Sequence, residues 1–327
     1  MTFRTVSVPV LFSLIYLATP LAAAGQQAGK VYRIGVLSAE VLPPRLLQSF
    51  QEGLRELGYE EGKNLAIESR DAGGKNERLA ALADELVQLK VDIILTVNTP
   101  ATQAAKNATA TIPIVMTRVA DPIKSGLVPS LARPGGNLTG VSSSSVDSAP
   151  KQIQLLKEIL PGTSRVAILW NGDNPAASLG VGGLEQAAAQ VGLRALRLPV
   201  RAPSDFLGAF QAAAQGRAEA AVVFEDVWLT KHRVEILNLA AKHLLPVISL
   251  YKDFVEAGGL LAYGASLPAV YRRAAYYVDR ILKGTKPRDL PIEQPTKFDL
   301  VINMKTAKVL GLTIPQSVLG RADEIIQ

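Results

Sequence analysis

The sequence predicts an α/β protein with two doubly wound parallel sheets, and three observations lead to this prediction. From Lys30 onward, short apolar runs without strict alternation, typical of strands buried on both faces, alternate with amphipathic segments. The 327 residues exceed one ordinary core and suit two domains of about 130 to 150 residues. Hydrophobic residues reach 48% and aromatic residues only 6%, a balance that favours helices packed on sheets over an aromatic-rich β-sandwich.

The first series of elements follows this alternation closely. Leu46 and Phe50 recur at helical spacing, and Gly58 stands where that helix would end. Thr99 is placed to cap a helix, with Pro100 in its first turn. Strands are predicted at 32–38, 64–72, 91–97 and 112–119, and helices at 45–58, 76–90 and 99–109.

A second series follows a stretch rich in Pro, Gly and Ser, residues 132–145, which we interpret as the junction between domains. A cleft between two such domains is a usual place for a ligand. Strands are predicted at 165–170, 194–200, 220–226, 246–250 and 259–265, and helices at 151–162, 182–192, 205–216, 233–244, 252–258 and 268–284. Residues 297–312 predict a last strand followed by a short helix.

The first 24 residues form a segment of another kind. Arg4 precedes an apolar run at 6–19, and Ala22 and Ala24 form an A-x-A pattern, so we expect a secretory signal peptide cleaved near Ala24. A membrane anchor is the alternative, but the run is short for a span of about 20 residues. The chain has no cysteine, which excludes disulfides, cysteine-bound metals and a lipid-modified cysteine. We therefore expect a free protein in the periplasm.

Charge and motifs exclude several function classes. The net charge of +6 is spread along helices among acidic residues, so we expect no nucleic-acid partner. The turn after 32–38 lacks G-x-G-x-x-G, and no P-loop or G-x-S-x-G motif occurs, so we expect no cofactor. His232 and His243, the two histidines, are too far apart along a helix to share a metal, so no metal site is expected. The pair Glu225 and Asp226 favours ligand binding over acid–base catalysis, because no thiol, metal or cofactor motif accompanies it.

Polar residues follow the carboxyl ends of several predicted strands, where parallel α/β sheets bind ligands. Thr99 stands at a helix start, which favours a ligand carboxylate, although it also suits a simple cap. Donors in one domain and carboxylates in the other suit a small zwitterion such as an amino acid. The candidate ligand-binding residues are Ser38, Ala39, Glu40, Asn98, Thr99, Pro100, Ala101, Asp121, Asn171, Asp173, Glu225, Asp226 and Tyr263.

Long motifs make the sequence similar to a known family. They include "GLRELGYEEGKNLAIESRDAGGKNERLAALADELVQLKVDIILT", "ADPIKSGLVPSLARPGGNLTGVS" and "RVAILWNGDNPA". On these the chain resembles the ABC transporter substrate-binding protein family that includes the tryptophan- and tyrosine-binding TrpX-type proteins. The first loop, "SAEVLPP", departs from the aromatic-amino-acid binders and is expected to bear on ligand choice.

The resemblance implies a type 1 periplasmic-binding fold, in which three chain crossings join two lobes. It places hinge residues at Val141, Ser142, Ala265 and Thr296. The N-terminal lobe would comprise 30–141 and 266–295, and the C-terminal lobe 142–265 and 296–327, after the signal peptide 1–24.

The function expected from the sequence is extracytoplasmic solute binding. The chain would act as a monomer, hold a small polar or zwitterionic ligand between its lobes, and deliver it to an ABC permease in the inner membrane. Two alternatives stay open at this point. One is a ligand-sensing partner of a membrane receptor or kinase, and the other is a cofactor-free enzyme on the same scaffold, although racemases of that kind commonly use two cysteines.

Overall fold

The computed structural model describes residues 1–2, 30–143, 145–224 and 226–327. The predicted signal peptide, with its cleavage near Ala24, and the candidate residue Glu225 lie outside the described residues. All elements described below belong to the unit Val31–Gln327.

The first sheet has five parallel strands, which confirms the prediction for this part of the chain. Its central strands are almost fully buried, as continuous apolar runs require when helices cover both faces. In sheet order the strands are β2 (Leu65–Asp71), β1 (Tyr32–Ser38), β3 (Ile93–Val97), β4 (Ile114–Val119) and β5 (Leu138–Ser142). Strand β5 lies inside the stretch interpreted as a junction. It was not predicted, because its buried run Leu138–Ser142 stands among glycines and serines.

The second sheet has seven strands and is mostly parallel. One pair departs from the predicted parallel arrangement, because β10 and β11 pair antiparallel, with Leu261 opposite Ile302. In sheet order the strands are β12 (Glu324–Ile326), β11 (Phe298–Asn303), β10 (Leu261–Ala265), β9 (Val247–Ser249), β8 (Ala220–Val223), β6 (Arg165–Asn171) and β7 (Arg194–Val200). Strand β12 was not predicted, because three residues are too few to show a pattern.

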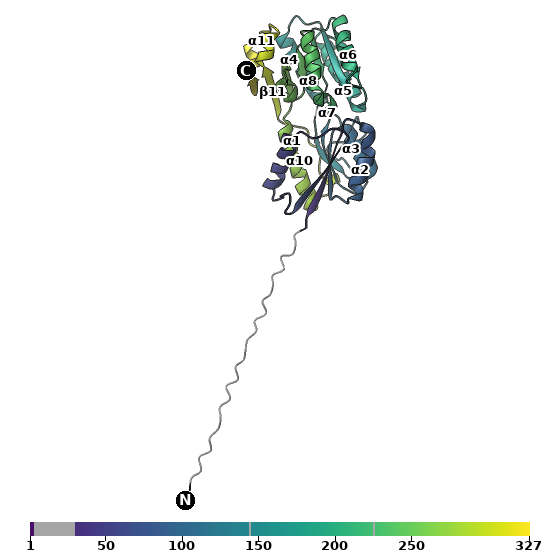
Figure 1. The fold of residues 1–327 in the computed structure, drawn as a ribbon, viewed down its shortest axis with the longest axis vertical. Helices are drawn as coiled ribbons and strands as arrows, with labels where there is room; N and C mark the ends of the chain where they lie inside the picture. Colours follow the sequence, from purple (N-terminus) through teal and green to yellow (C-terminus); the bar gives the residue numbers. More distant parts are fainter. Residues whose placement is uncertain (3–29, 144, 225) are drawn as a thin grey trace. The chain divides into compact units, whose positions relative to one another are not determined.

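Helices flank both sheets (Figure 1). They are α1 (Pro44–Glu56), α2 (Leu79–Gln88), α3 (Thr99–Ala108), α4 (Ser145–Ile159), α5 (Pro175–Gln190), α6 (Asp205–Gln215), α7 (Val227–Lys231), α8 (Arg233–Lys242), α9 (Lys252–Glu256), α10 (Leu267–Leu282), α11 (Met304–Val309) and α12 (Gln316–Leu319). Helix α4 begins before the predicted start and contains Pro150 in its interior. The short helix α7 was not predicted, yet it borders the candidate site.

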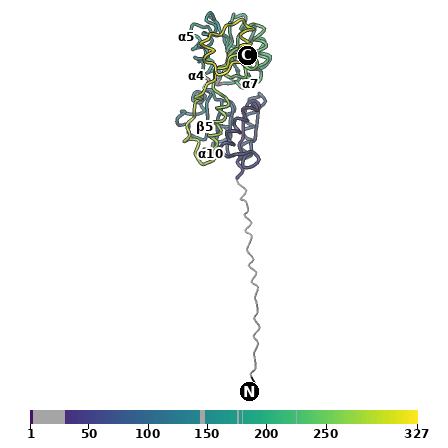
Figure 2. The backbone as a smooth tube through the Cα atoms, turned by 90° about the vertical axis from the view of Figure 1, so that its left-hand side faces the viewer, coloured from purple at the N-terminus to yellow at the C-terminus, as the bar shows by residue number. Residues whose placement is uncertain are grey.

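Helix α10 connects strands of the second sheet but packs on the first. The strands before and after it, β10 and β11, belong to the second sheet, whereas α10 contacts α1, β4 and β5 (Figures 1 and 2). Its residue Tyr271 is fully buried in the same apolar cluster as Ile34 of β1 and Phe50 of α1. The chain therefore passes between the two groups of elements three times, after β5, before α10 and after α10.

Candidate functional site

Three cavities in the described part of the chain are lined both by Val227 and by residues that follow strands of the first sheet. The largest, called the cleft cavity here, has a volume of about 510 Å³. It is lined by residues 40–45, Gly73, Val97 and Arg118 from the first group and by Val227, Thr230, Lys231, Arg233, Asp253 and Glu256 from the second. Two further cavities of about 10 Å³ each, called the polar cells here, contain both Asn98 and Asp226. Since Val227 lines all three, the cleft cavity and the polar cells are neighbours.

Asn98 forms the first-sheet side of both polar cells. It has a φ of 79°, and its Oδ1 accepts a hydrogen bond of 3.1 Å from the backbone N–H of Ala101, so Asn98 caps α3. Asparagine tolerates this left-handed conformation better than most residues do. The sequence prediction that Thr99 is the cap is therefore wrong, because Thr99 is the first residue of the helix proper. Thr99 is buried and lines one polar cell.

Asp226 forms the second-sheet side of the polar cells. Its Oδ1 accepts hydrogen bonds from the backbone N–H groups of Trp228 (2.9 Å) and Leu229 (3.3 Å), and its Oδ2 accepts one from Nδ2 of Asn174 (2.9 Å). Burial nevertheless raises the pKa of this carboxyl, because removal from water outweighs the four donors around it, one of them Asn171. Asp226 thus caps α7 and joins it to the turn after β6.

The cleft cavity is bordered by two ion pairs that connect the two groups of elements. Lys231 Nζ lies 3.0 Å from Oε2 of Glu40, and Arg45 lies 2.5 Å from Oδ1 of Asp253. In both pairs the carboxylate is buried, with 7% of the Glu40 side chain and 10% of the Asp253 side chain exposed, whereas the cations are 51% and 36% exposed. In these two pairs the carboxylates are therefore the buried members, and their cations reach in from the rim of the cleft cavity.

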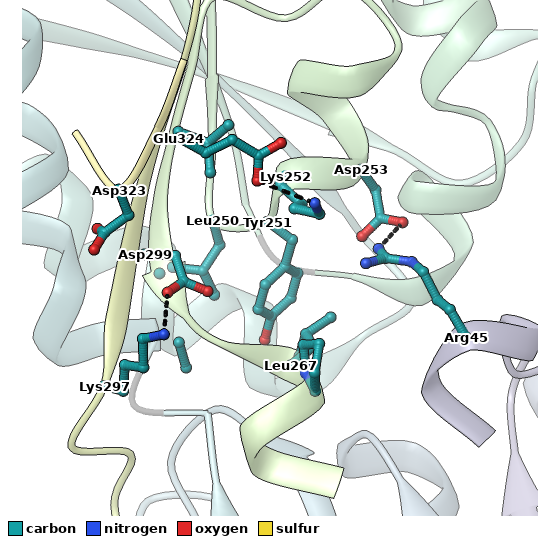
Figure 3. A pocket seen from close by; sticks show the side chains of 14 residues that line it. Arg45, Leu250, Tyr251, Lys252, Asp253, Leu267, Lys297, Asp299, Asp323 and Glu324 are labelled. Carbon is teal, nitrogen blue, oxygen red and sulfur yellow. Dashed lines mark hydrogen bonds and ion pairs between the residues drawn. The ribbon is translucent and has the colours of Figure 1, made fainter. Parts of the chain in front are cut away.

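Arg45 and Asp253 also border a neighbouring cavity of about 240 Å³ (Figure 3). Figure 3 shows Arg45 reaching across from α1 toward Asp253, so their ion pair lies at a wall common to both cavities. Four of the remaining charged groups of this neighbouring cavity form two ion pairs. Lys252 pairs with Glu324 at 3.2 Å, and Lys297 pairs with Asp299 at 3.6 Å.

Arg118 is a site residue that the sequence reasoning missed. It lies in β4 with only 4% of its surface exposed and a φ of 55°. It lines the cleft cavity and one polar cell, and its guanidinium lies 4.6 Å from the ring centroid of Tyr251. A single arginine within the apolar run "IPIVMTRV" was the available signal, because charged residues are seldom fully buried without a specific role.

The structure brings seven of the candidate ligand-binding residues to these cavities, and an eighth, Ser38, to the turn beside them. The turn after β1 is fixed by the Ser38 hydroxyl, which donates a 2.6 Å hydrogen bond to the backbone carbonyl of Glu40. Ala39 and Pro100 line a polar cell, and so does Asn171. The set at the cavities or at this turn is Ser38, Ala39, Glu40, Asn98, Thr99, Pro100, Asn171 and Asp226.

Four other candidates are not among the residues that line the cleft cavity or the polar cells. Asp121 Oδ1 accepts hydrogen bonds from the backbone N–H groups of the two residues at 123 and 124, so this carboxylate stabilises a turn. Asp173 is exposed and pairs with Arg201 at 3.1 Å. Ala101 is fully buried in an apolar core cluster, and the ring of Tyr263 stacks on that of Phe298. Sequence position placed these residues near strand ends but could not give the direction of their side chains.

The predicted hinge residues lie on the segments that pass between the groups. Val141 forms a bridge with Glu293, and the Ser142 N–H donates to the Glu293 carbonyl at 2.9 Å. Ala265 ends β10, and Thr296 lies between α10 and β11. Their role as a hinge, like the lobe boundaries, stays a prediction.

Two kinds of feature are absent from the described residues. No helix in the described ranges has both the length and the apolar character needed to cross a membrane. In the same part of the chain, no group of three or more His, Cys, Asp or Glu side chains is placed to hold a metal ion.

Comparison with known proteins gives a consistent result. The family model for ABC transporter substrate binding proteins matches residues 44–326. A tyrosine-binding protein of Clostridioides difficile is 27% identical over 265 residues, which cover 81% of this chain and 76% of that protein.

Solved structures agree with this match. A conserved domain protein from Vibrio cholerae has a TM-score of 0.85 at 31% identity, covering 90% of this chain and 100% of that one. An ABC domain from Streptococcus pneumonia in complex with L-Trp has a TM-score of 0.84 at 27% identity, covering 91% and 100%. The ligand-free, open structure of a substrate-binding protein from Clostridium difficile has a TM-score of 0.67 at 26% identity, with the same coverage.

Proposed function

Because the chain belongs to the family of ABC transporter substrate-binding proteins, we propose that it is the extracytoplasmic receptor of an ABC importer and binds a zwitterionic amino acid in the cleft cavity. In this proposal the protein is released into the periplasm, passes its ligand to a permease in the inner membrane, and leaves the ligand chemically unchanged. Residues 30–141 with 266–295, and 142–265 with 296–327, would form two lobes that close on the ligand.

One observation supports this proposal above the others. The cleft cavity, of about 510 Å³, is lined by residues from both groups of elements and presents buried carboxylates and guanidinium or ammonium groups together. An α-amino acid carries one positive and one negative group, so it complements such a lining by charge-assisted hydrogen bonds. The volume of the cleft cavity lies within the range of about 300 to 1,000 Å³ usual for small-molecule sites.

The apolar part of the lining supports an amino acid with a large side chain. The segment Val41–Pro44 and the side chains of Val97 and Val227 contribute apolar surface. The tyrosine-binding relative and the L-Trp complex support an aromatic side chain.

Similarity to two relatives, one with L-Trp bound and one ligand-free and open, supports a closed arrangement. At nearly equal identity, the TM-score is 0.84 with the L-Trp complex and 0.67 with the ligand-free, open structure. Ion pairs that connect the two groups, such as Arg45–Asp253, are contacts that closure would form.

A thermal-shift screen of the mature protein with the twenty L-amino acids, sugars and nucleosides tests the proposal. We expect an aromatic amino acid to raise the melting temperature in proportion to ln(1 + [L]/Kd), and calorimetry with the same ligand to give a one-to-one complex. Recovery of unchanged ligand after long incubation is expected of a receptor. Stabilisation by sugars or nucleosides and by no amino acid would contradict the ligand class.

A further inference from the structure

We propose that Glu40 binds the ammonium group of the ligand at the position that the ammonium group of Lys231 occupies in this structure, so that the bound ligand displaces Lys231. The inference rests on the proposed function, since it assigns the cationic half of the ligand to one residue of the same cavity. It names the ligand class more narrowly, as molecules with a free primary ammonium group.

The carboxylate of Glu40 is held in a fixed position at the cavity wall. Only 7% of its side chain is exposed, and the Ser38 hydroxyl fixes the turn by binding the Glu40 carbonyl. Gly74 packs so closely that a Cβ atom there would lie 2.5 Å from Oε1 of Glu40. A buried carboxylate needs a cation or hydrogen-bond donors, and the cavity is where a ligand can provide them.

The cation that Glu40 has in this structure is easy to remove. Nζ of Lys231 lies 3.0 Å from Oε2 and 3.2 Å from Oε1, but 51% of the lysine side chain is exposed. It ends the five-residue helix α7, so its flexible stem can turn into water without moving the backbone. Ion pairs with an exposed partner contribute little to stability. A ligand ammonium would replace one ammonium by another, so the charge facing Glu40 stays balanced.

The other carboxylates near the cleft are less suited to this role. Asp226 already accepts hydrogen bonds from four donors and faces polar cells of about 10 Å³, each with room for about one water molecule. Asp253 is held at 2.5 Å by the guanidinium of Arg45. Glu256 is 45% exposed and pairs with Lys252 at 3.1 Å. Glu40 thus combines burial, a large cavity and a displaceable partner.

The experiment uses calorimetry on the mature protein with L-tyrosine, L-tryptophan, tyramine, tryptamine and N-acetyl-L-tyrosine as probes. We expect Glu40→Gln to weaken binding of the amines by about 10- to 100-fold, the scale of a hydrogen bond to a charged group. Lys231→Met removes the competing ammonium and is expected to tighten binding by about 2- to 5-fold. N-acetyl-L-tyrosine is expected to bind at least about 10-fold more weakly than L-tyrosine.

Matched variants separate this role from a structural one. Lys283→Met removes another exposed lysine that pairs with a buried carboxylate, that of Asp279 at 2.7 Å, outside the cleft cavity, and is expected to leave the affinity unchanged. Glu40→Asp keeps the charge and is expected to bind amines better than Glu40→Gln does. Circular dichroism and melting temperatures of each variant establish that it is folded.

The outcomes distinguish the inference from the proposed function. If amino acids bind and Glu40→Gln changes nothing, or Lys231→Met weakens binding as much as Glu40→Gln does, the inference is overturned and the receptor for amino acids stands. If tyramine or tryptamine bind with the expected variant pattern but no amino acid binds, the inference stands and the amino-acid function fails. If no amine binds the wild-type protein, the inference is overturned.

Discussion

Gly74 and Glu40 are packed so closely that glycine is the one residue type that leaves room for the carboxylate. A Cβ atom at Gly74 would lie 2.5 Å from Oε1 of Glu40 and 3.2 Å from Cδ1 of Trp228. Gly74 also has a φ of 87°, which side-chain-bearing residues seldom adopt. The turn "DAGGKNE" therefore positions the wall of the cleft cavity as well as reversing the chain.

Gly74→Ala is expected to weaken ligand binding by moving the carboxylate of Glu40, and to cost about 1 to 3 kcal/mol of stability. Gly62→Ala is the matched control. It has a similar φ of 81°, but an added Cβ would meet nothing within 4 Å, and Gly62 is not among the residues that line the cleft cavity. We expect Gly62→Ala to lower stability by about 1 kcal/mol without changing affinity. Equal affinities for the two variants in calorimetry would show that Gly74 does not position Glu40.

Asn98→Ala is expected to lower the free energy of unfolding by about 1 to 2 kcal/mol, because it removes the cap of α3 and places alanine at a φ of 79°. Asn98→Gly loses the cap but tolerates the conformation, so it is expected to be the more stable of the two. Thr99→Ala leaves the cap in place. Urea unfolding of the three variants is the measurement. A larger decrease in the free energy of unfolding for Thr99→Ala than for Asn98→Ala would indicate that Thr99 is the cap.

The raised pKa of Asp226 predicts a specific pH dependence of stability. Above the unfolded value of about 3.9, the folded protein holds this proton more tightly than the unfolded chain does. The contribution of Asp226 to the free energy of unfolding is therefore favourable below that value and falls as pH rises toward the folded pKa. We expect the difference in the free energy of unfolding between the wild type and Asp226→Asn, measured with urea, to decline as pH rises from about 4 to 7.

Asp205 gives the control of opposite sign. The backbone N–H groups of Arg201 and Ala202 lower the pKa of its carboxyl. Its stabilisation is present above the unfolded value and is lost as pH falls through the folded value. The difference in the free energy of unfolding between the wild type and Asp205→Asn is thus expected to rise with pH. The same slope for both variants would contradict the burial of Asp226.

Arg45→Ala is expected to speed ligand dissociation about tenfold, because it leaves the buried carboxylate of Asp253 without its cation in the closed arrangement. Stopped-flow release with a competing ligand measures the rate. The control is Arg272→Ala, which removes ion pairs between α10 and α1 on one side of the cleft, with Glu52 and Glu56. If both variants release ligand at the wild-type rate, the Arg45–Asp253 pair does not stabilise closure.

Much of the fold could be predicted because its elements bury continuous apolar runs. Strand β1 lies at the predicted residues, and the helix with Leu46 and Phe50 buries both. Elements without such a run were missed, as β5 among glycines and serines shows. The antiparallel pairing of β10 and β11 depends on the packing of α10 against the first group of elements. This packing joins residues more than 200 positions apart, such as Tyr59 and Asp279.

The candidate site could be predicted only by position along the chain. Glu40 and Asp226 follow strands, and the strand-end rule found both. Their different surroundings, a large cavity for Glu40 and four hydrogen-bond donors for Asp226, arise from loops that meet in space. The partner of Glu40, Lys231, lies 191 positions away, so no local pattern could have found it.

The excursion of α10 has a consequence for the order in which the protein can fold. During synthesis the five strands of the first sheet are complete by Ser142, but the helix that covers one of their faces ends only at Leu282. Until then the apolar cluster around Ile34 and Phe50 lacks the fully buried ring of Tyr271. The growing chain thus exposes an incomplete apolar core while about half of its length is synthesised, and such surfaces aggregate readily. We therefore expect that the N-terminal segment does not fold as an independent unit. A truncated product ending near Ser142 is expected to depend on chaperones until an α10 fragment is added in trans.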